Sequence, residues 1–164
     1  MKEIAQQLRE TTAMLQPLLE KISEKVASEK PNPKKWSKKE ILGHLIDSAG
    51  NNQQKFVRML IMPSEQLDFV GYAQDEWVAI QAYQNASWRQ LVRTWFEYNQ
   101  HIAHIIEHAD PTKLQRTVRI NGEGEAWRLD FIMSDYLEHL KHHMKAILPP
   151  DTGIKSTFGN VYNA

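Results

Sequence analysis

The chain of 164 residues contains no cysteine. Disulfide bonds are therefore excluded, and so are a thiolate metal ligand and a cysteine nucleophile supplied by the chain itself. The absence agrees with a reducing compartment, so we expect a cytoplasmic protein. A chain of this length can bury a hydrophobic core without disulfide support, which predicts one domain over residues 1–164.

The sequence also lacks a net charge and a long hydrophobic run. Lys plus Arg and Asp plus Glu number 20 each, which argues against nucleic acid or an anionic membrane as the main partner. No apolar run approaches the length of a transmembrane helix, and the charged start MKEIAQQLRE is unlike a signal peptide. The unusual feature of the composition is its seven histidines. The side of each predicted helix on which they lie indicates which of them could bind a metal.

Four long helical segments are predicted from the spacing of apolar residues. The first covers residues 2–29, and Pro17 is expected to kink it. The second begins at Ser37, which forms a capping box with Glu40, and it runs to about residues 59–61. Because several independent start signals agree there, the beginning of this helix is well defined by sequence.

The remaining segments complete an all-α prediction. The third helix begins at Ser87 and is ended by Pro111, and the fourth covers about residues 130–148. Between them, alternating Thr, Val, Ile and Arg residues around NGEG predict a small β-hairpin. Residues 63–86 form a long connection with a short helix inside it, and residues 151–164 are expected to be irregular. The pattern predicts a four-helix bundle with a long crossover between its second and third helices.

The last predicted helix carries three histidines within five residues. His139 and His143 fall on an apolar stripe that includes Tyr136, and their Cβ atoms are expected ~5–6 Å apart. His142 falls on the polar side with Glu138. A pair of imidazoles at this spacing suits one divalent ion. The alternative is that each ring bonds a nearby carbonyl, carboxylate or water.

The second helix supplies a possible third ligand. His44 borders its apolar stripe together with Ser48 and Asn51, and polar residues in that place indicate a cavity. Gly43 could let a neighbouring helix or a ligand come close. Taken alone, His44 also fits an ordinary histidine at the core edge. Asp47 can share its side of the helix as an orienting group or general base, or it can face solvent.

The third helix carries a rival group of histidines. His101, His104 and His108 are spaced by three and then four residues, which also resembles a ligand pattern. The apolar stripe of this helix points elsewhere, however. We therefore expect His104 and His108 to be solvated, and His101 to lie closer to the core edge, where it could support a metal site from outside.

Two motifs, WSKKEILGHLIDS and DYLEHLKHHMKAIL, together with GYAQDEWVAIQAYQNASW between them, resemble the DinB-like superfamily. Within it they resemble the branch of metal-dependent hydrolases and bacillithiol S-transferases. The resemblance covers about residues 36–148. It implies a four-helix bundle that holds zinc or nickel through three histidines, here His44, His139 and His143. It also implies a small-molecule substrate.

The chemistry that this resemblance implies is thiol transfer or hydrolysis. Three imidazoles leave open positions on a divalent ion, which could activate water or deprotonate a borrowed low-molecular-weight thiol. Tyr136, Trp77 and Tyr83 could contact substrate or cover the site, and ordinary packing would explain them as well. The alternative function is a non-catalytic bundle that binds metal or forms a homodimer.

Overall fold

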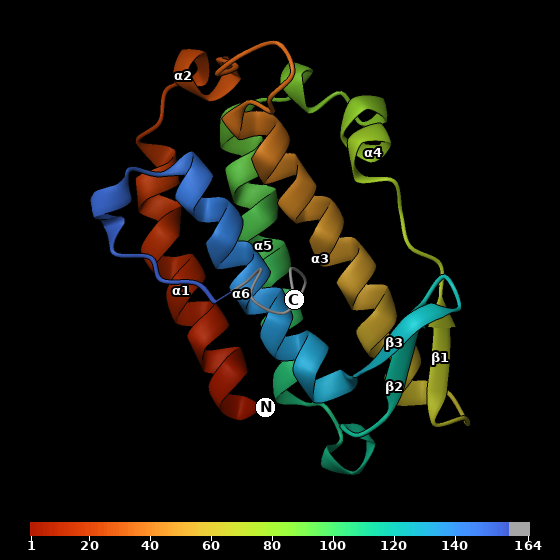
Figure 1. Ribbon diagram of the computed structural model, residues 1–164. Coiled ribbons are helices and arrows are strands. Elements are labelled where there is room, and N and C mark those ends of the chain that lie inside the picture. The colour runs from red at the N-terminus through yellow and green to blue at the C-terminus, as the bar shows by residue number, and fades with distance from the viewer. Residues whose placement is uncertain (158–164) are drawn as a thin grey trace.

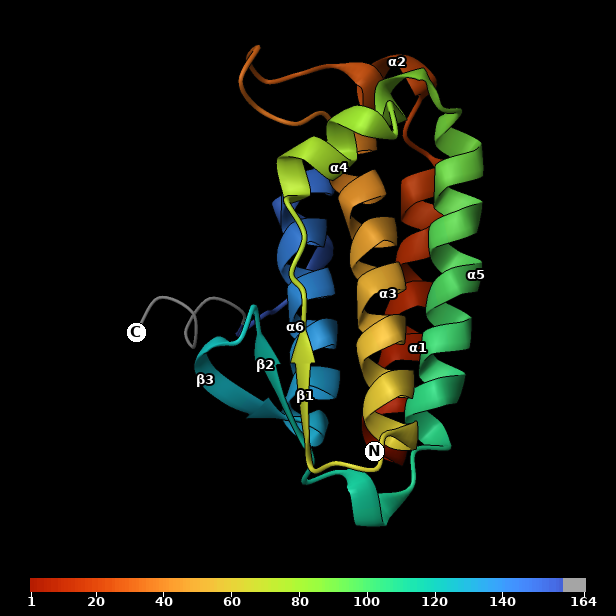
Figure 2. The ribbon, with the colours of Figure 1, turned by 90° about the vertical axis from the view of Figure 1, so that its right-hand side faces the viewer.

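The computed structural model describes residues 1–157. Four long helices form a bundle, and they are α1 (Lys2–Glu20), α3 (Lys38–Ile61), α5 (Trp88–Glu107) and α6 (Leu129–Ile147). Helix α1 packs on α5, α5 on α3, α3 on α6, and α6 returns to α1. Figures 1 and 2 show this ring, in which α1 and α3 stand diagonally opposite each other. The predicted four-helix bundle is confirmed.

The crossover between α3 and α5 sets the direction of the bundle helices. It contains strand β1 (Gln66–Phe69), helix α4 (Gln74–Ile80) and the 3-10 turn η1 (Tyr83–Asn85). These elements carry the chain back along the bundle, so α3 and α5 run in the same direction (Figures 1 and 2). The predicted short helix is confirmed as α4, which lies against α3 near its N-terminal end.

Strand β1, at the start of the crossover, belongs to a small sheet. The predicted hairpin is confirmed as β2 (Thr117–Ile120) and β3 (Glu123–Arg128), joined by Asn121 and Gly122 with φ of 55° and 70°. Positive φ at both central residues is the geometry for which an Asn-Gly turn is favoured. Strand β1 pairs in parallel with β2 and makes a third strand that the sequence analysis missed.

The first predicted helix is wrong in one respect. Helix α1 continues through Pro17 and ends at Glu20, and a separate helix α2 covers Glu24–Ser28. The break lies at Ser23, whose hydroxyl accepts the backbone N–H of Val26 and so begins the second helix. An N-cap three residues beyond the end of α1 therefore divides the predicted segment into two helices. The kink at Pro17 stays a prediction.

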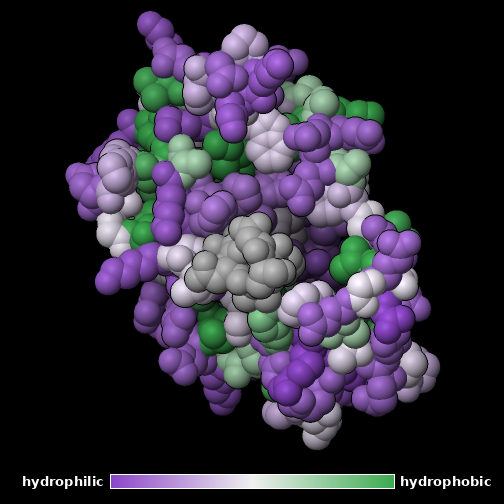
Figure 3. Space-filling model, viewed as in Figure 1, coloured by the Kyte–Doolittle hydropathy of each residue, from purple (hydrophilic) through white to green (hydrophobic). Residues whose placement is uncertain are grey.

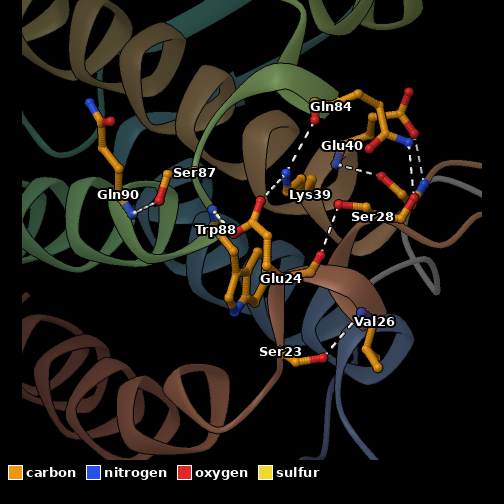
Figure 4. A network of polar contacts seen from close by, with 11 residues as sticks. Ser23, Glu24, Val26, Ser28, Lys39, Glu40, Gln84, Ser87, Trp88 and Gln90 are labelled. Carbon is orange, nitrogen blue, oxygen red and sulfur yellow. Dashed lines mark hydrogen bonds and ion pairs between the residues drawn. The ribbon is translucent and has the colours of Figure 1, made fainter.

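A network of polar contacts around one buried lysine connects α2, α3, η1 and α5 at the end of the bundle where α3 begins (Figure 4). Lys39 is only 4% exposed; it forms an ion pair with Glu24 of α2 and donates to the carbonyl of Gln84 in η1 at 3.2 Å. Glu24 also accepts the backbone N–H of Trp88, the first residue of α5, at 2.9 Å. This network fixes the start of α3 relative to the crossover.

Both predicted helix starts are observed. The capping box at α3 is complete, because Ser37 Oγ accepts the Glu40 N–H at 3.2 Å and the Glu40 carboxylate accepts the Ser37 N–H at 2.8 Å. At α5, Ser87 Oγ accepts the Gln90 N–H at 3.4 Å. The fixed start of α3 places His44 in the second turn of that helix.

The outer surface is mostly hydrophilic on the face of Figure 1, with hydrophobic side chains in small, separate groups (Figure 3). Among residues 1–157, no helix has both the length and the apolar character needed to cross a bilayer. The C-terminal segment is irregular after a 3-10 turn at Pro150–Thr152, as predicted, and Ser156 donates to the carbonyl of Glu138. Residues 158–164 of the predicted irregular tail lie outside the described residues.

Candidate metal centre

Three histidines from two helices converge inside the bundle. His44 of α3 is fully buried, and His139 and His143 of α6 are half-buried beside it. Their ring centroids are 5.2 Å apart for His44 and His139, 4.8 Å for His44 and His143, and 4.5 Å for His139 and His143. One donor atom from each ring lies within 4.8 Å of the other two. The structure therefore brings together all three residues that were selected as metal ligands.

Two of the ring nitrogen atoms are spaced as ligands of one ion would be. Nε2 of His44 lies 3.3 Å from Nε2 of His139. Two nitrogens bound tetrahedrally to zinc at ~2.0–2.1 Å would be about 3.3–3.4 Å apart. A hydrogen bond between the two rings gives a similar separation but leaves the third ring out. A single ion accounts for all three rings, so the residues fit a divalent metal.

The electrostatics of the cluster favour neutral rings. Burial lowers the pKa of His44 to about 4, although the charge of Asp75 opposes the shift. Burial also lowers the pKa of His143 to about 4, with smaller effects from His44 and His142. The pKa of His139 falls well below its ordinary value for the same reason, reinforced by the neighbouring rings. Neutral imidazoles keep the lone pairs that a metal requires.

Helix α3 also supplies support for one ligand. Ser48 Oγ lies 3.3 Å from Nδ1 of His139 and accepts from Asn52 at 3.2 Å. When Nε2 of His139 faces the other rings, Nδ1 carries the proton and donates to the serine, which fixes the ring orientation. Nδ1 of His44 is buried without a hydrogen-bond partner among the described residues.

Two separate hollows border the cluster. One, of about 550 Å³, is lined by His143, Trp36, Ile41 and Ala146, with lysines at its rim. The other, of about 380 Å³, is lined by His139, by Ile132 and Tyr136, and by polar side chains, which are Ser48, Asn52, Lys55, Tyr72, Gln74 and Asp135. The cavity indicated by polar residues beside His44 is thus present, and Ser48 borders it.

Asp47 is buried, so the solvent-facing alternative for this residue is wrong. Its side chain is 5% exposed, and its Oδ1 accepts from Tyr83 Oη at 2.6 Å and from the side-chain amide of Gln81. Burial raises the pKa of Asp47, and these two hydrogen bonds oppose the rise. Oδ2 has no partner among the described residues. The carboxylate therefore connects α3 to the crossover beside the three histidines.

The aromatic candidates occupy different places. The Tyr83 ring lies directly over Gly43, where a Cβ atom would approach Tyr83 Cδ2 to 2.1 Å, so the glycine permits this close contact. Tyr136 is buried and donates to Asn99 Oδ1 at 2.7 Å, which commits its hydroxyl to the core. Trp77 is 42% exposed and packs against Tyr72.

The other histidines are exposed. His142 lies on the outer side of α6, and His104 and His108 lie on the outer side of α5, as predicted. His101 is exposed as well and pairs with Gln53 at 3.4 Å, so the expectation that it supports the metal site is wrong. Its position relative to the core was misjudged because the buried stripe of α5 also includes Asn99 and Ala103.

Sequence analysis missed three residues at the hollows, namely Lys55, Tyr72 and Asp75. Lys55 follows His44 and Ser48 at helical spacing, so the period of α3 could have identified it. Tyr72 and Asp75 come from the crossover, whose path over the bundle no local pattern encodes.

Comparisons with known proteins agree with this fold. YfiT from Bacillus subtilis, described as a probable metal-dependent hydrolase with an unusual four-helix bundle topology, superposes with a TM-score of 0.77 at 18% identity, over 88% of this chain and 82% of that one. A variant of a mycothiol-dependent maleylpyruvate isomerase superposes with a TM-score of 0.65 at 12% identity, over 97% of this chain and 63% of that one. At these identities both likenesses establish the fold.

The sequence comparison establishes the family. No match to a protein of curated function was found. The family model of the DinB superfamily, in contrast, matches residues 7–147, which include the three histidines and every bundle helix in whole or in large part. The chain therefore belongs to the DinB superfamily.

Proposed function

We propose that the protein is a metal-dependent enzyme that transfers a low-molecular-weight thiol to a small electrophilic substrate. The observation that carries the proposal is that two separate hollows border the three imidazoles, one lined by His143 and the other by His139. Such an arrangement leaves room for two reactants, one in each hollow. The thiol is a cosubstrate, because the chain has no cysteine to supply it.

In this proposal His44, His139 and His143 hold zinc or nickel, since three imidazoles accept either ion. The ion supplies Lewis-acid chemistry that lowers the pKa of a bound thiol or water. The chain itself orients the reactants and limits access of solvent to the cluster. In the transfer, sulfur forms a bond to the electrophilic carbon, the leaving group departs with the electron pair, and the thiol proton passes to solvent.

Hydrolysis is the second candidate, and the likeness to YfiT, a probable metal-dependent hydrolase, favours it. The fold of the mycothiol-dependent isomerase favours a thiol cosubstrate instead. The two candidates differ in one requirement, because hydrolysis proceeds with water alone and transfer needs an added thiol.

Asp47 is proposed to take part by positioning. Its Oδ1 is held by Tyr83 and Gln81, which supports a role in fixing the crossover over the cluster rather than in accepting a proton. Asp47→Asn is then expected to raise KM more than it lowers kcat, with an unchanged pH profile. A general base would instead show a loss of kcat and of the corresponding limb of the pH profile.

The first test measures metal in protein purified without an affinity tag or added metal. We expect about one divalent ion per chain, lost in His143→Ala and retained in His142→Ala. The control is well matched because His142 is the adjacent residue on the exposed side of α6. No ion in any of the three proteins would remove the metal centre from the proposal.

The second test measures turnover with defined probes. The metal-loaded protein is assayed with 1-chloro-2,4-dinitrobenzene and small thiols, and separately with p-nitrophenyl acetate in the absence of thiol. Thioether formation above the His44→Ala control supports transfer, and thiol-independent ester cleavage above that control supports hydrolysis. A metal-loaded protein that turns over neither probe class would favour the non-catalytic, metal-binding or dimerising alternative.

A further inference from the structure

Lys55 is a cation set into the polar hollow beside His139. It lies on α3, eleven residues after His44 and seven after Ser48, so these residues share one side of the helix. Ser48, Lys55 and His139 line the same hollow. The lysine is therefore close to the metal cluster without being one of its ligands.

The ammonium group of Lys55 is without an ionic partner in the part of the chain that the structure describes. Its Nζ lies 5.7 Å from the centroid of the Phe69 ring of β1, which orients the side chain. Burial lowers the pKa of Lys55 to about 8, and the charge of Asp135 opposes the shift. At neutral pH the group is still mainly an ammonium, and it is less hydrated than a lysine in open solvent.

The second hollow differs in the placement of its charges. Lys34, Lys35 and Asp75 line it and are exposed, whereas Trp36, Ile41 and Ala146 form an apolar wall. An exposed ammonium gains little from an ion pair because water and salt screen it. A half-buried ammonium gains more, so an anionic group is held better in the hollow of Lys55.

We propose that Lys55 binds a carboxylate of the thiol cosubstrate in the hollow beside His139, while the electrophile enters the more apolar hollow beside His143. The proposal rests on the thiol transfer proposed above and assigns a chemical class to the thiol, namely a small thiol that carries a carboxylate. Asp135 lies in the same hollow and repels an anion from its own side. Lys55 is thus the attractive group there.

Thiol binding to cobalt-loaded protein tests this assignment without relying on turnover. Thiolate ligation to Co²⁺ produces a near-ultraviolet charge-transfer band, which is titrated with mercaptosuccinate and with neutral 2-mercaptoethanol. Lys55→Met should weaken mercaptosuccinate binding about tenfold, which corresponds to one charged hydrogen bond. Binding of 2-mercaptoethanol should change less than about twofold. Lys55→Arg should restore most of the affinity for mercaptosuccinate.

The matched control is Lys25→Met, which removes the same charge from an exposed residue of α2. It should bind both thiols as the unaltered protein does, and all variants should retain the cobalt spectrum that reports the three histidines. Equal affinities for mercaptosuccinate in Lys55→Met and the unaltered protein would overturn the assignment of Lys55 but not the proposed thiol transfer. A cobalt-loaded protein that shows no band with any thiol would overturn the proposed thiol transfer, and the assignment with it.

Discussion

Among residues 1–157, two groups of donor residues have ligand atoms close enough to share one ion. His44, His139 and His143 form one, and His104, Glu107 and His108 form the other; within each, the donor atoms lie within 4.8 Å of one another. The first group joins α3 to α6 and is buried or half-buried. The second group comes from one helix, α5, and both of its histidines are exposed.

The groups differ most in the partners that their atoms already have. In the exposed group, Glu107 forms an ion pair with Arg9 at 2.6 Å, which occupies its carboxylate. In the buried group, Nε2 of His44 and His139 face each other, and burial disfavours protonation of either ring. Proximity of donors is thus insufficient, and the burial of the rings distinguishes the candidate metal site from the surface cluster.

The largest effect is expected when one ligand of the buried group is removed. His139→Ala should abolish metal retention, with an affinity loss of at least about 100-fold, above the usual cost of losing an outer-shell partner. His104→Ala should retain the full metal content. Metal analysis and competition with a chelator measure both. Equal retention in the two variants would show that the comparison between the groups is mistaken.

Acid should reveal the burial of the same rings in the chelator-treated protein. Burial lowers the folded-state pKa of His44 and of His143 to about 4. Below pH ~6.5, the ordinary pKa of histidine, the unfolded chain therefore binds more protons than the folded chain does. The contribution of these rings to the free energy of unfolding is therefore fully present above about pH 6.5. It is lost as pH falls toward 4, by up to ~1.4 kcal/mol per pH unit for each proton. Urea denaturation between pH 4 and 7 measures the slope, which His44→Gln should reduce.

The sequence predicted most of the bundle because its signals are local. The Ser37 capping box and the spacing of His139 and His143 each depend on residues within one or two helical turns, and both are observed. The division at Ser23 was missed although an N-cap serine is a local signal, because the apolar period continues to Val26 on the far side of it.

What the sequence could not supply is the path of the crossover. The parallel pairing of β1 with β2 joins residues about fifty positions apart, and no local pattern selects that partner. The same applies to Asp47, whose burial depends on donors from Gln81 and Tyr83. Helical periodicity placed Asp47 near His44 but left its exposure open, since only the returning chain covers it.

A smaller effect is expected from the support of one ligand. Ser48→Ala removes the oxygen 3.3 Å from His139 Nδ1, and loss of such a partner should weaken metal binding about tenfold while stoichiometry is kept. Ser134→Ala is the control, because within residues 1–157 the Ser134 hydroxyl bonds the Asp130 carbonyl of its own helix and no other group. A chelator titration compares the two. An unchanged affinity in Ser48→Ala would indicate that the ring is oriented by packing alone.

The smallest effect should come from freeing the exposed group. Arg9→Ala removes the ion pair of Glu107 and so gives His104, Glu107 and His108 their best opportunity to bind an ion. We expect no measurable zinc uptake by calorimetry in an Arg9→Ala, His139→Ala double variant, because the rings stay exposed. Uptake of one ion would instead mean that the ion pair, rather than exposure, keeps this cluster from binding metal. The ion pair of the carboxylate would then explain the difference between the two groups better than burial does.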